Sequence, residues 1–282
     1  MIKTPPGWGA AVLTRAYESM TAVRPGWTER ESALPAVQRL HVSDLQWALK
    51  RGIEDFGASR TDVIFLCVIY PLLGLLLARV ASGYQMLPLV FPLASGFALI
   101  GPLAAVGLNE MSRRRELGLS AGLADAFSVF RSPAIFSIIL LGIGLVGMFL
   151  FWLVLSNAVY DLTLGPQPPT SLSQFAHDVI NTHAGRTMAF LGIGSGFLFA
   201  VVAITISVVS FPLLLDRNVS LETAIRTSAQ VVARNPDTIA VWGLIIAGGL
   251  IAGSIPLLLG LVVVMPVLGH ATWHLYRRAL PR

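Results

Sequence analysis

The sequence predicts an all-α fold, a polytopic membrane helical bundle with six transmembrane helices and both termini in the cytoplasm. Hydropathy, scarcity of charge and the placement of basic residues predict it. Of the 282 residues, 55% are hydrophobic and 12% are charged, and the mean hydropathy is +0.72. Soluble domains carry about 25% charged residues. The apolar residues also gather in long blocks, which is typical of membrane spans.

A transmembrane helix needs about 20 predominantly apolar residues. The last apolar stretch, of about 40 residues, is too long for one span at a rise of about 1.5 Å per residue. Turn signals in residues 253–256 (GSIP) divide it. The predicted spans are 62–80, 86–108, 133–157, 188–211, 237–254 and 256–276.

The basic residues set the orientation. Segments 1–61, 109–132, 212–236 and 277–282 carry eight, four, three and three Lys or Arg residues. Only Arg79 and Arg186 lie outside these segments, so the positive-inside rule places all four in the cytoplasm, 277–282 as a short tail. The net charge of +5 thus reflects topology, and we expect no nucleic-acid partner.

Two segments outside the spans show helix signals. In the cytoplasmic segment 1–61, which lacks the apolar core of a cleaved signal, an amphipathic helix is expected near 43–57. It would lie on the membrane surface or pack on the protein's own loops. Its predicted apolar face consists of Leu45, Leu49, Ile53 and Phe56. In the extracytoplasmic loop 158–187, a capping box at Ser171 and Gln174 predicts a helix near 172–183 that stops at Gly185.

The sequence contains two pairs of similar segments. Residues 102–114 (PLAAVGLNEMSRR) share a frame with residues 266–278 (PVLGHATWHLYRR), and in each segment a proline precedes an Arg pair by eleven residues. Residues 126–133 (AFSVFRSP) likewise echo residues 229–236 (AQVVARNP). The pattern fits a parallel internal repeat or, alternatively, convergence of short basic loops.

Candidate chemistry centres on the last span, where His270 and His274 share one helical face at i and i+4. With Glu110, which takes the place of His274 in the repeat frame, they are the candidate metal ligands. Otherwise they are interfacial histidines that bond to neighbouring helices. No span carries a central Asp, Glu, Lys or Arg, which weighs against a proton-coupled carrier. We predict no catalytic residues and no cofactor, and common nucleotide, zinc-protease and hydrolase motifs are absent.

Several stretches resemble a bacterial family of predicted integral membrane proteins of unknown function, which is sometimes labelled as similar to cytochrome c oxidase subunit I. They are residues 45–56 (LQWALKRGIEDF), 91–93 (FPL) through 101–102 (GP), 110–118 (EMSRRRELG), 211–217 (FPLLLDR) and 266–277 (PVLGHATWHLYR). The resemblance implies an inner-membrane protein of about six spans. The oxidase label does not fit, because a haem–copper subunit needs about twelve spans and six metal-binding histidines on several helices.

Three functions remain open at this point. The first is a non-enzymatic accessory, assembly or scaffold component of the bacterial inner membrane, linked to respiratory complexes, with the lipid bilayer and other membrane proteins or further copies of itself as partners. The second is a transporter or channel for a small solute, for which a polar cavity between the two halves would be the sign. The third is a metal- or haem-binding redox protein that uses His270, His274 and Glu110.

Overall fold

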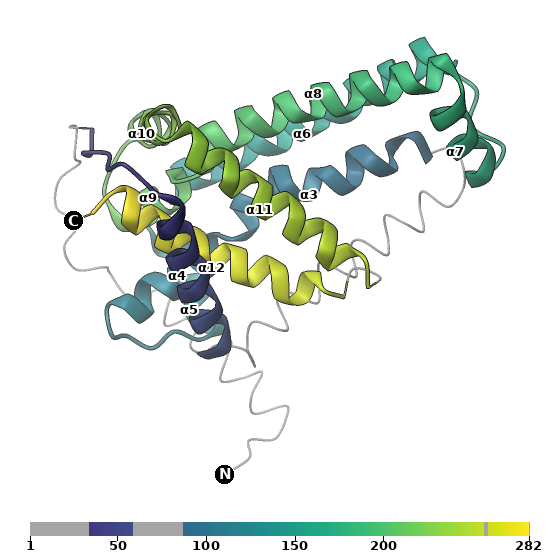
Figure 1. Cartoon of the computed structure of the whole chain (residues 1–282). Coiled ribbons are helices and arrows are strands. Elements are labelled where there is room, and N and C mark those ends of the chain that lie inside the picture. The colour runs from purple at the N-terminus through teal and green to yellow at the C-terminus, as the bar shows by residue number, and fades with distance from the viewer. Residues whose placement is uncertain (1–33, 59–86, 257–258, 282) are drawn as a thin grey trace.

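A computed structural model describes residues 34–58, 87–256 and 259–281 (Figure 1). The predicted span 62–80 lies outside these ranges. Throughout the described part of the chain the regular elements are helices. A helix covers residues 42–58. The others are η1 (Leu87–Leu89), α3 (Val90–Ala104), α4 (Val106–Glu116), α5 (Leu123–Ala126), η2 (Phe127–Arg131), α6 (Ile135–Thr163), α7 (Leu172–Asn181), α8 (His183–Ser207), α9 (Ser210–Asp216), α10 (Leu221–Arg234), α11 (Pro236–Ser254) and α12 (Leu261–Ala279).

Three helical segments in the described ranges are long and apolar enough to cross a membrane: Ile135–Thr163, His183–Asp216 and Pro236–Ser254. They correspond to the predicted spans 133–157, 188–211 and 237–254. The other two predicted spans that the structure describes, 86–108 and 256–276, correspond to the 15-residue α3 with part of α4, and to the 19-residue α12. The described chain is thus an all-helical bundle with three candidate spans, and the count of six stays a prediction.

Local signals explain where these helices begin, bend and end. Pro102 lies inside α3, and the helix is interrupted at Ala105 before α4 continues; proline removes one backbone hydrogen bond and favours such a break. Helix α6 continues six residues beyond the predicted end at residue 157, and the turn after it uses Gly165 at a φ of +93°. Pro236 occupies the first turn of α11, where a missing N–H costs nothing.

The helix predicted near 172–183 is present, but it ends earlier than predicted, and Gly185 does not stop it. Helix α7 begins where Ser171 accepts a hydrogen bond from the backbone of Gln174, but it ends at Asn181. Thr182 then caps the next helix by accepting from the backbone N–H of Gly185. Gly185 is therefore in the first turn of α8, where its missing side chain allows close packing on the backbone of Asp178 and Val179.

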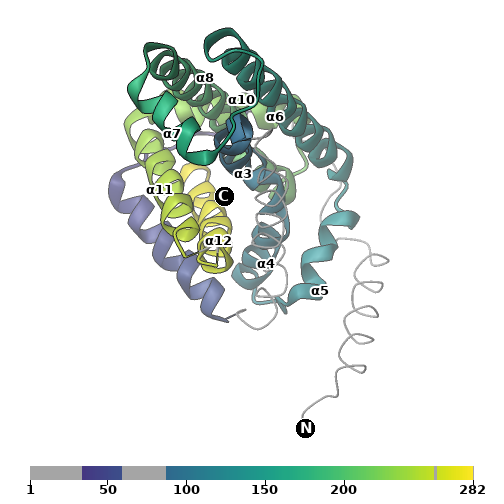
Figure 2. The same cartoon turned by 90° about the vertical axis from the view of Figure 1, so that its right-hand side faces the viewer.

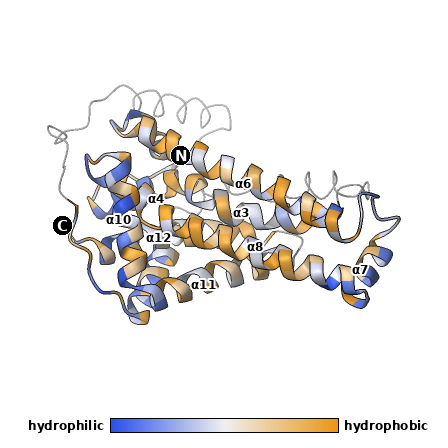
Figure 3. Cartoon of the chain, turned by 90° about the horizontal axis from the view of Figure 1, so that it is seen from above, coloured by the Kyte–Doolittle hydropathy of each residue, from blue (hydrophilic) through white to orange (hydrophobic). Residues whose placement is uncertain are grey.

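The arrangement separates an apolar body from two polar ends. Helices α6 and α8 run side by side, with α3, α11 and α12 beneath them, and α7 lies across their far end (Figures 1 and 2). Hydrophobic residues dominate along α6, α8 and α11, whereas hydrophilic residues gather around α10 and again at α7 (Figure 3). This distribution suits helices whose middle portions face lipid.

At the polar end near α10, four helical elements pack together: the helix over residues 42–58, α4, α9 and the carboxyl-terminal half of α12. We call this region the helix junction. Its core contains large, fully enclosed side chains from α9 and α12, namely Phe211, Leu213, Leu214, Leu215, Trp273, Leu275 and Tyr276. The end of α12 is therefore surrounded by protein.

The helix over residues 42–58 packs closely against α12. Its buried stripe is Leu45, Ala48, Gly52 and Asp55, whereas Ile53, part of the predicted apolar face, is 58% exposed. A Cβ atom on Gly52 would lie 2.6 Å from the carbonyl oxygen of Val267 and 2.9 Å from the Cβ of Ala271. Leu45 of the predicted apolar face is buried, but the small residues Ala48 and Gly52 continue the contact face, because they let the two backbones approach.

We predict that Gly52→Ala destabilises the protein and Gly57→Ala does not. Alanine normally favours a helix over glycine by about 0.5–1 kcal/mol. At Gly52 the added methyl group collides with α12, which we expect to cost about 1–3 kcal/mol; at Gly57 nothing lies within 4 Å. Thermal unfolding of both variants in detergent, followed by circular dichroism, tests this. Equal midpoints would contradict the close packing.

Candidate functional site

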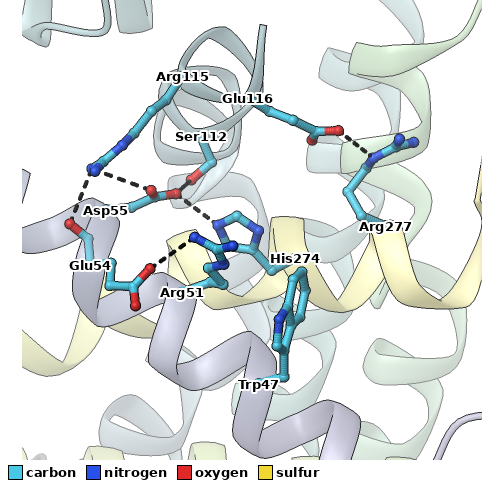
Figure 4. A pocket seen from close by; sticks show the side chains of 9 residues that line it. All are labelled: Trp47, Arg51, Glu54, Asp55, Ser112, Arg115, Glu116, His274 and Arg277. Atoms are coloured by element: carbon cyan, nitrogen blue, oxygen red, sulfur yellow. Dashed lines mark hydrogen bonds and ion pairs between the residues drawn. The ribbon is translucent and has the colours of Figure 1, made fainter. Parts of the chain in front are cut away.

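A polar pocket of about 400 Å³ opens at the helix junction. Its walls come from the helix over residues 42–58, from α4 and from α12, and they carry three arginines, three carboxylates, two aromatic rings and one hydroxyl (Figure 4). The lining residues are Trp47, Arg51, Glu54, Asp55, Ser112, Arg115, Glu116, His274 and Arg277. Cationic and anionic side chains are thus balanced around one cavity.

Asp55 is the centre of this site. It is 6% exposed, and its Oδ2 atom accepts a hydrogen bond of 2.6 Å from the Ser112 hydroxyl and lies 2.8 Å from Nε2 of His274. Its Oδ1 atom lies 3.4 Å from a guanidinium nitrogen of Arg115. Ser112 Oγ in turn lies 2.8 Å from Nδ1 of the fully buried His270. A continuous polar chain therefore leads from His274 at the pocket through Asp55 and Ser112 to His270.

The neighbouring ion pairs join α4, α9 and α12. Glu116 accepts from the Trp273 indole at 2.9 Å and from Nε of Arg277 at 3.1 Å. Arg277 also reaches Asp216 at 3.4 Å, and the Tyr276 hydroxyl donates to the same carboxylate at 2.7 Å. Charge-assisted bonds of this kind are stronger than neutral ones. The three helix ends are thus held by shared carboxylates.

The candidate metal residues are divided between two clusters. His270 and His274 both join the Asp55 chain, but Glu110 accepts two hydrogen bonds from Arg113, at 2.8 and 3.1 Å, and one from Ser128 at 2.8 Å. Within the described ranges, no group of three or more His, Cys, Asp or Glu side chains is arranged to hold a metal ion. The three-residue metal site stays a prediction.

Burial and bonding act in opposite directions on Asp55. Burial of the carboxyl group acts to raise its pKa, but hydrogen bonds from His274 and Ser112, together with the charges of His274 and His270, outweigh it. The pKa of Asp55 therefore lies below its ordinary value, and the group is a stable carboxylate. A carboxylate that is held ionised and fully bonded serves better as a structural anchor than as a general acid.

Sequence reasoning found the histidines of this site but missed Asp55 and Ser112. The predicted apolar face of this helix, Leu45, Leu49, Ile53 and Phe56, does not include Asp55. A signal was present, because Asp55 follows Leu45, Ala48 and Gly52 at the spacing of one helical stripe, which is the stripe that the structure buries. Ser112 sits among arginines and gives no such signal.

The bundle and its apolar spans define a helical integral membrane protein. Residues 90–216 match the model of the family described as "Predicted integral membrane protein (DUF2189)", a family of unknown function. The resemblance expected from the sequence is confirmed over that region. It covers α3 to α9, including Ser112, Arg115 and Glu116 of the site. Comparison with curated proteins and with solved structures gives no match.

We predict that Asp55→Asn lowers the stability at pH 7 by about 1–3 kcal/mol, because His274, Ser112 and Arg115 lose a charged acceptor. A lowered pKa means that the carboxylate stabilises the fold above its unfolded pKa of about 3.9, and that this contribution disappears as the pH falls through the folded pKa. The difference in stability between wild type and Asp55→Asn should become smaller only below about pH 4.

Thermal unfolding of both proteins across a pH series measures this gap. Glu222→Gln is the matched control, because Glu222 is exposed on α10 and pairs only with Arg226 in the contacts described. If Asp55→Asn unfolds at the wild-type midpoint at pH 7, Asp55 does not anchor the junction.

Proposed function

We propose that the protein is a non-enzymatic accessory, assembly or scaffold component of the bacterial inner membrane, working beside a larger complex such as a respiratory one. The family match supports membrane integration. The observation that carries the proposal is the helix junction. There, charged groups of the site bond to one another and fix helix ends, and the resulting rigid surface carries a pocket.

The carboxylates of the junction support a structural role. Asp55, Glu110, Glu116 and Asp216 each accept bonds from side chains on the same or neighbouring helices. A catalytic acid or base needs a pKa matched to proton transfer and access to a substrate. Carboxylates that already accept hydrogen bonds from neighbouring side chains are better suited to holding a scaffold together than to proton transfer.

The rim of the pocket has the composition of a protein contact site. Trp47 packs edge-on against His274 with ring centroids 5.6 Å apart, and the guanidinium group of Arg278 lies 4.2 Å from the Trp47 ring centroid. Arg51 and Glu54 form an exposed pair at 3.0 Å. Tryptophan and arginine are the residues that most often carry binding energy at protein interfaces. The pocket rim is therefore the surface where we expect a partner.

The test compares Arg51→Glu with Arg226→Glu. Both arginines are exposed and pair with a glutamate on their own helix, but only Arg51 lines the pocket. Tagged proteins are solubilised from native membranes in mild detergent and separated by native electrophoresis. We expect wild type and Arg226→Glu to migrate in a complex much larger than the 30.2 kDa chain, and Arg51→Glu to be released from it.

Two outcomes would contradict the proposal. One is a wild-type protein that migrates alone under the mildest conditions. The other is an Arg51→Glu variant that stays in the complex while its thermal unfolding matches wild type.

Transport of a small solute is a second candidate, because the pocket lies between α4 and α12, which belong to the two echoed segments. Purified protein in liposomes would then increase solute flux, and Trp47→Ala would alter that flux.

The redox alternative is tested separately. A visible absorption band or a bound metal in the purified protein, lost on His274→Ala, would support it. A colourless, metal-free protein would rule it out.

A further inference from the structure

We propose that α7 is an interfacial helix, which lies flat in the headgroup region of the bilayer and presses Leu172 and Ile180 against lipid at the end of the α6–α8 hairpin opposite the helix junction. The ligand of this surface is the acyl–headgroup boundary of the membrane. The inference is independent of the function proposed above.

The faces of α7 have three separate environments. Phe175 packs on the hairpin, with its ring centroid 6.4 Å from that of Tyr160 on α6. Ser173, Gln174, His177 and Asn181 form an exposed polar face. Between the face of Phe175 and the polar face, Leu172 and Ile180 point outward and are 63% and 67% exposed. With Ala176 they follow one helical stripe at i, i+4 and i+8.

The orientation of α7 is fixed by contacts at both ends. Its amino terminus is capped by the Ser171 hydroxyl. At its carboxyl terminus the Thr182 hydroxyl donates to the carbonyl oxygen of Asp178 at 2.6 Å, and Gly185 brings the start of α8 against the α7 backbone. The loop before it is held where the Tyr160 hydroxyl donates to the carbonyl oxygen of Gln167 at 2.6 Å. The outward direction of Leu172 and Ile180 is therefore built into the hairpin.

The ends of α6 and α8, across which α7 lies, also expose large apolar side chains. Leu162, at the end of α6, is 86% exposed, and Phe190, two turns into α8, is 78% exposed. Both belong to the candidate spans Ile135–Thr163 and His183–Asp216. Figures 1 and 2 show α7 lying across the ends of these helices. An exposed apolar stripe at the end of two candidate spans has lipid as its simplest occupant.

The length of α6 places α7 at the right depth. From Ile135 to Leu162 the helix rises about 40 Å at 1.5 Å per residue, which is close to the full bilayer thickness of about 40–45 Å with headgroups. If Ile135 lies at one face, then α7 lies at the other, among headgroups. There its polar face meets water and its apolar stripe meets acyl chains.

Site-directed spin labelling tests the proposal. The single cysteine, Cys67, is replaced by serine, and single cysteines are introduced as Leu172→Cys, Ile180→Cys, Ser173→Cys and His177→Cys. The purified full-length protein is labelled and reconstituted into phosphatidylethanolamine–phosphatidylglycerol vesicles. Collision rates with oxygen, which partitions into lipid, and with a water-soluble nickel chelate are then compared.

We expect the labels at 172 and 180 to collide severalfold more with oxygen than with the nickel chelate, and the labels at 173 and 177 to show the reverse. Preference for the nickel chelate at all four positions would overturn the proposal, because α7 would then be surrounded by water. Low collision with both reagents at 172 and 180, with dipolar broadening between labels, would also overturn it and would identify a second copy of the chain as the occupant.

Discussion

A single buried carboxylate joins three helices that are far apart in the sequence. Asp55 bonds to Ser112, 57 residues away, and to His274, 219 residues away. In a low-dielectric interior such bonds strengthen one another, and a charge left without partners is costly. One carboxylate therefore ties the helix over residues 42–58 to both α4 and α12, three residues from the close backbone contact at Gly52.

The two echoed segments of the chain meet at this network. Gly269 packs on Ala105 and Leu108, His270 meets Ser112, and Trp273 meets Glu116. The contacts advance together along α4 and α12, so the two segments lie side by side and run in the same direction. Their origin as a repeat stays a prediction. The matching spacing of the two segments has a structural consequence. Because α4 and α12 end at the same height, the complementary polar groups on the two helices lie opposite one another.

The spans and the site differed in how far they could be predicted. Helices α6, α8 and α11 follow from hydropathy, because lipid imposes one simple requirement on a long segment. The division at Ala105 depends on Pro102 and on packing against α12, which hydropathy does not record. The pairing of Asp55 with His274 depends on a contact across most of the chain. Periodicity could have identified the buried stripe of Asp55, but it could not have named the partners.

The segment 34–41, which precedes the helix over residues 42–58, has a further consequence for biogenesis. Asn235 accepts from the backbone of Leu40 and donates to Gln38, and Gln38 donates to Ala279 near the carboxyl end. Asn235 is made 195 residues after Leu40, which at typical synthesis rates is about 10–40 s later, and Ala279 is made later still. Residues 38–40 can therefore complete these contacts only after residue 279 has been synthesised. A chain truncated before α12 would keep Asn235 as a partner for Leu40 and Gln38, but it would lack the carbonyl oxygen of Ala279 to which Gln38 donates.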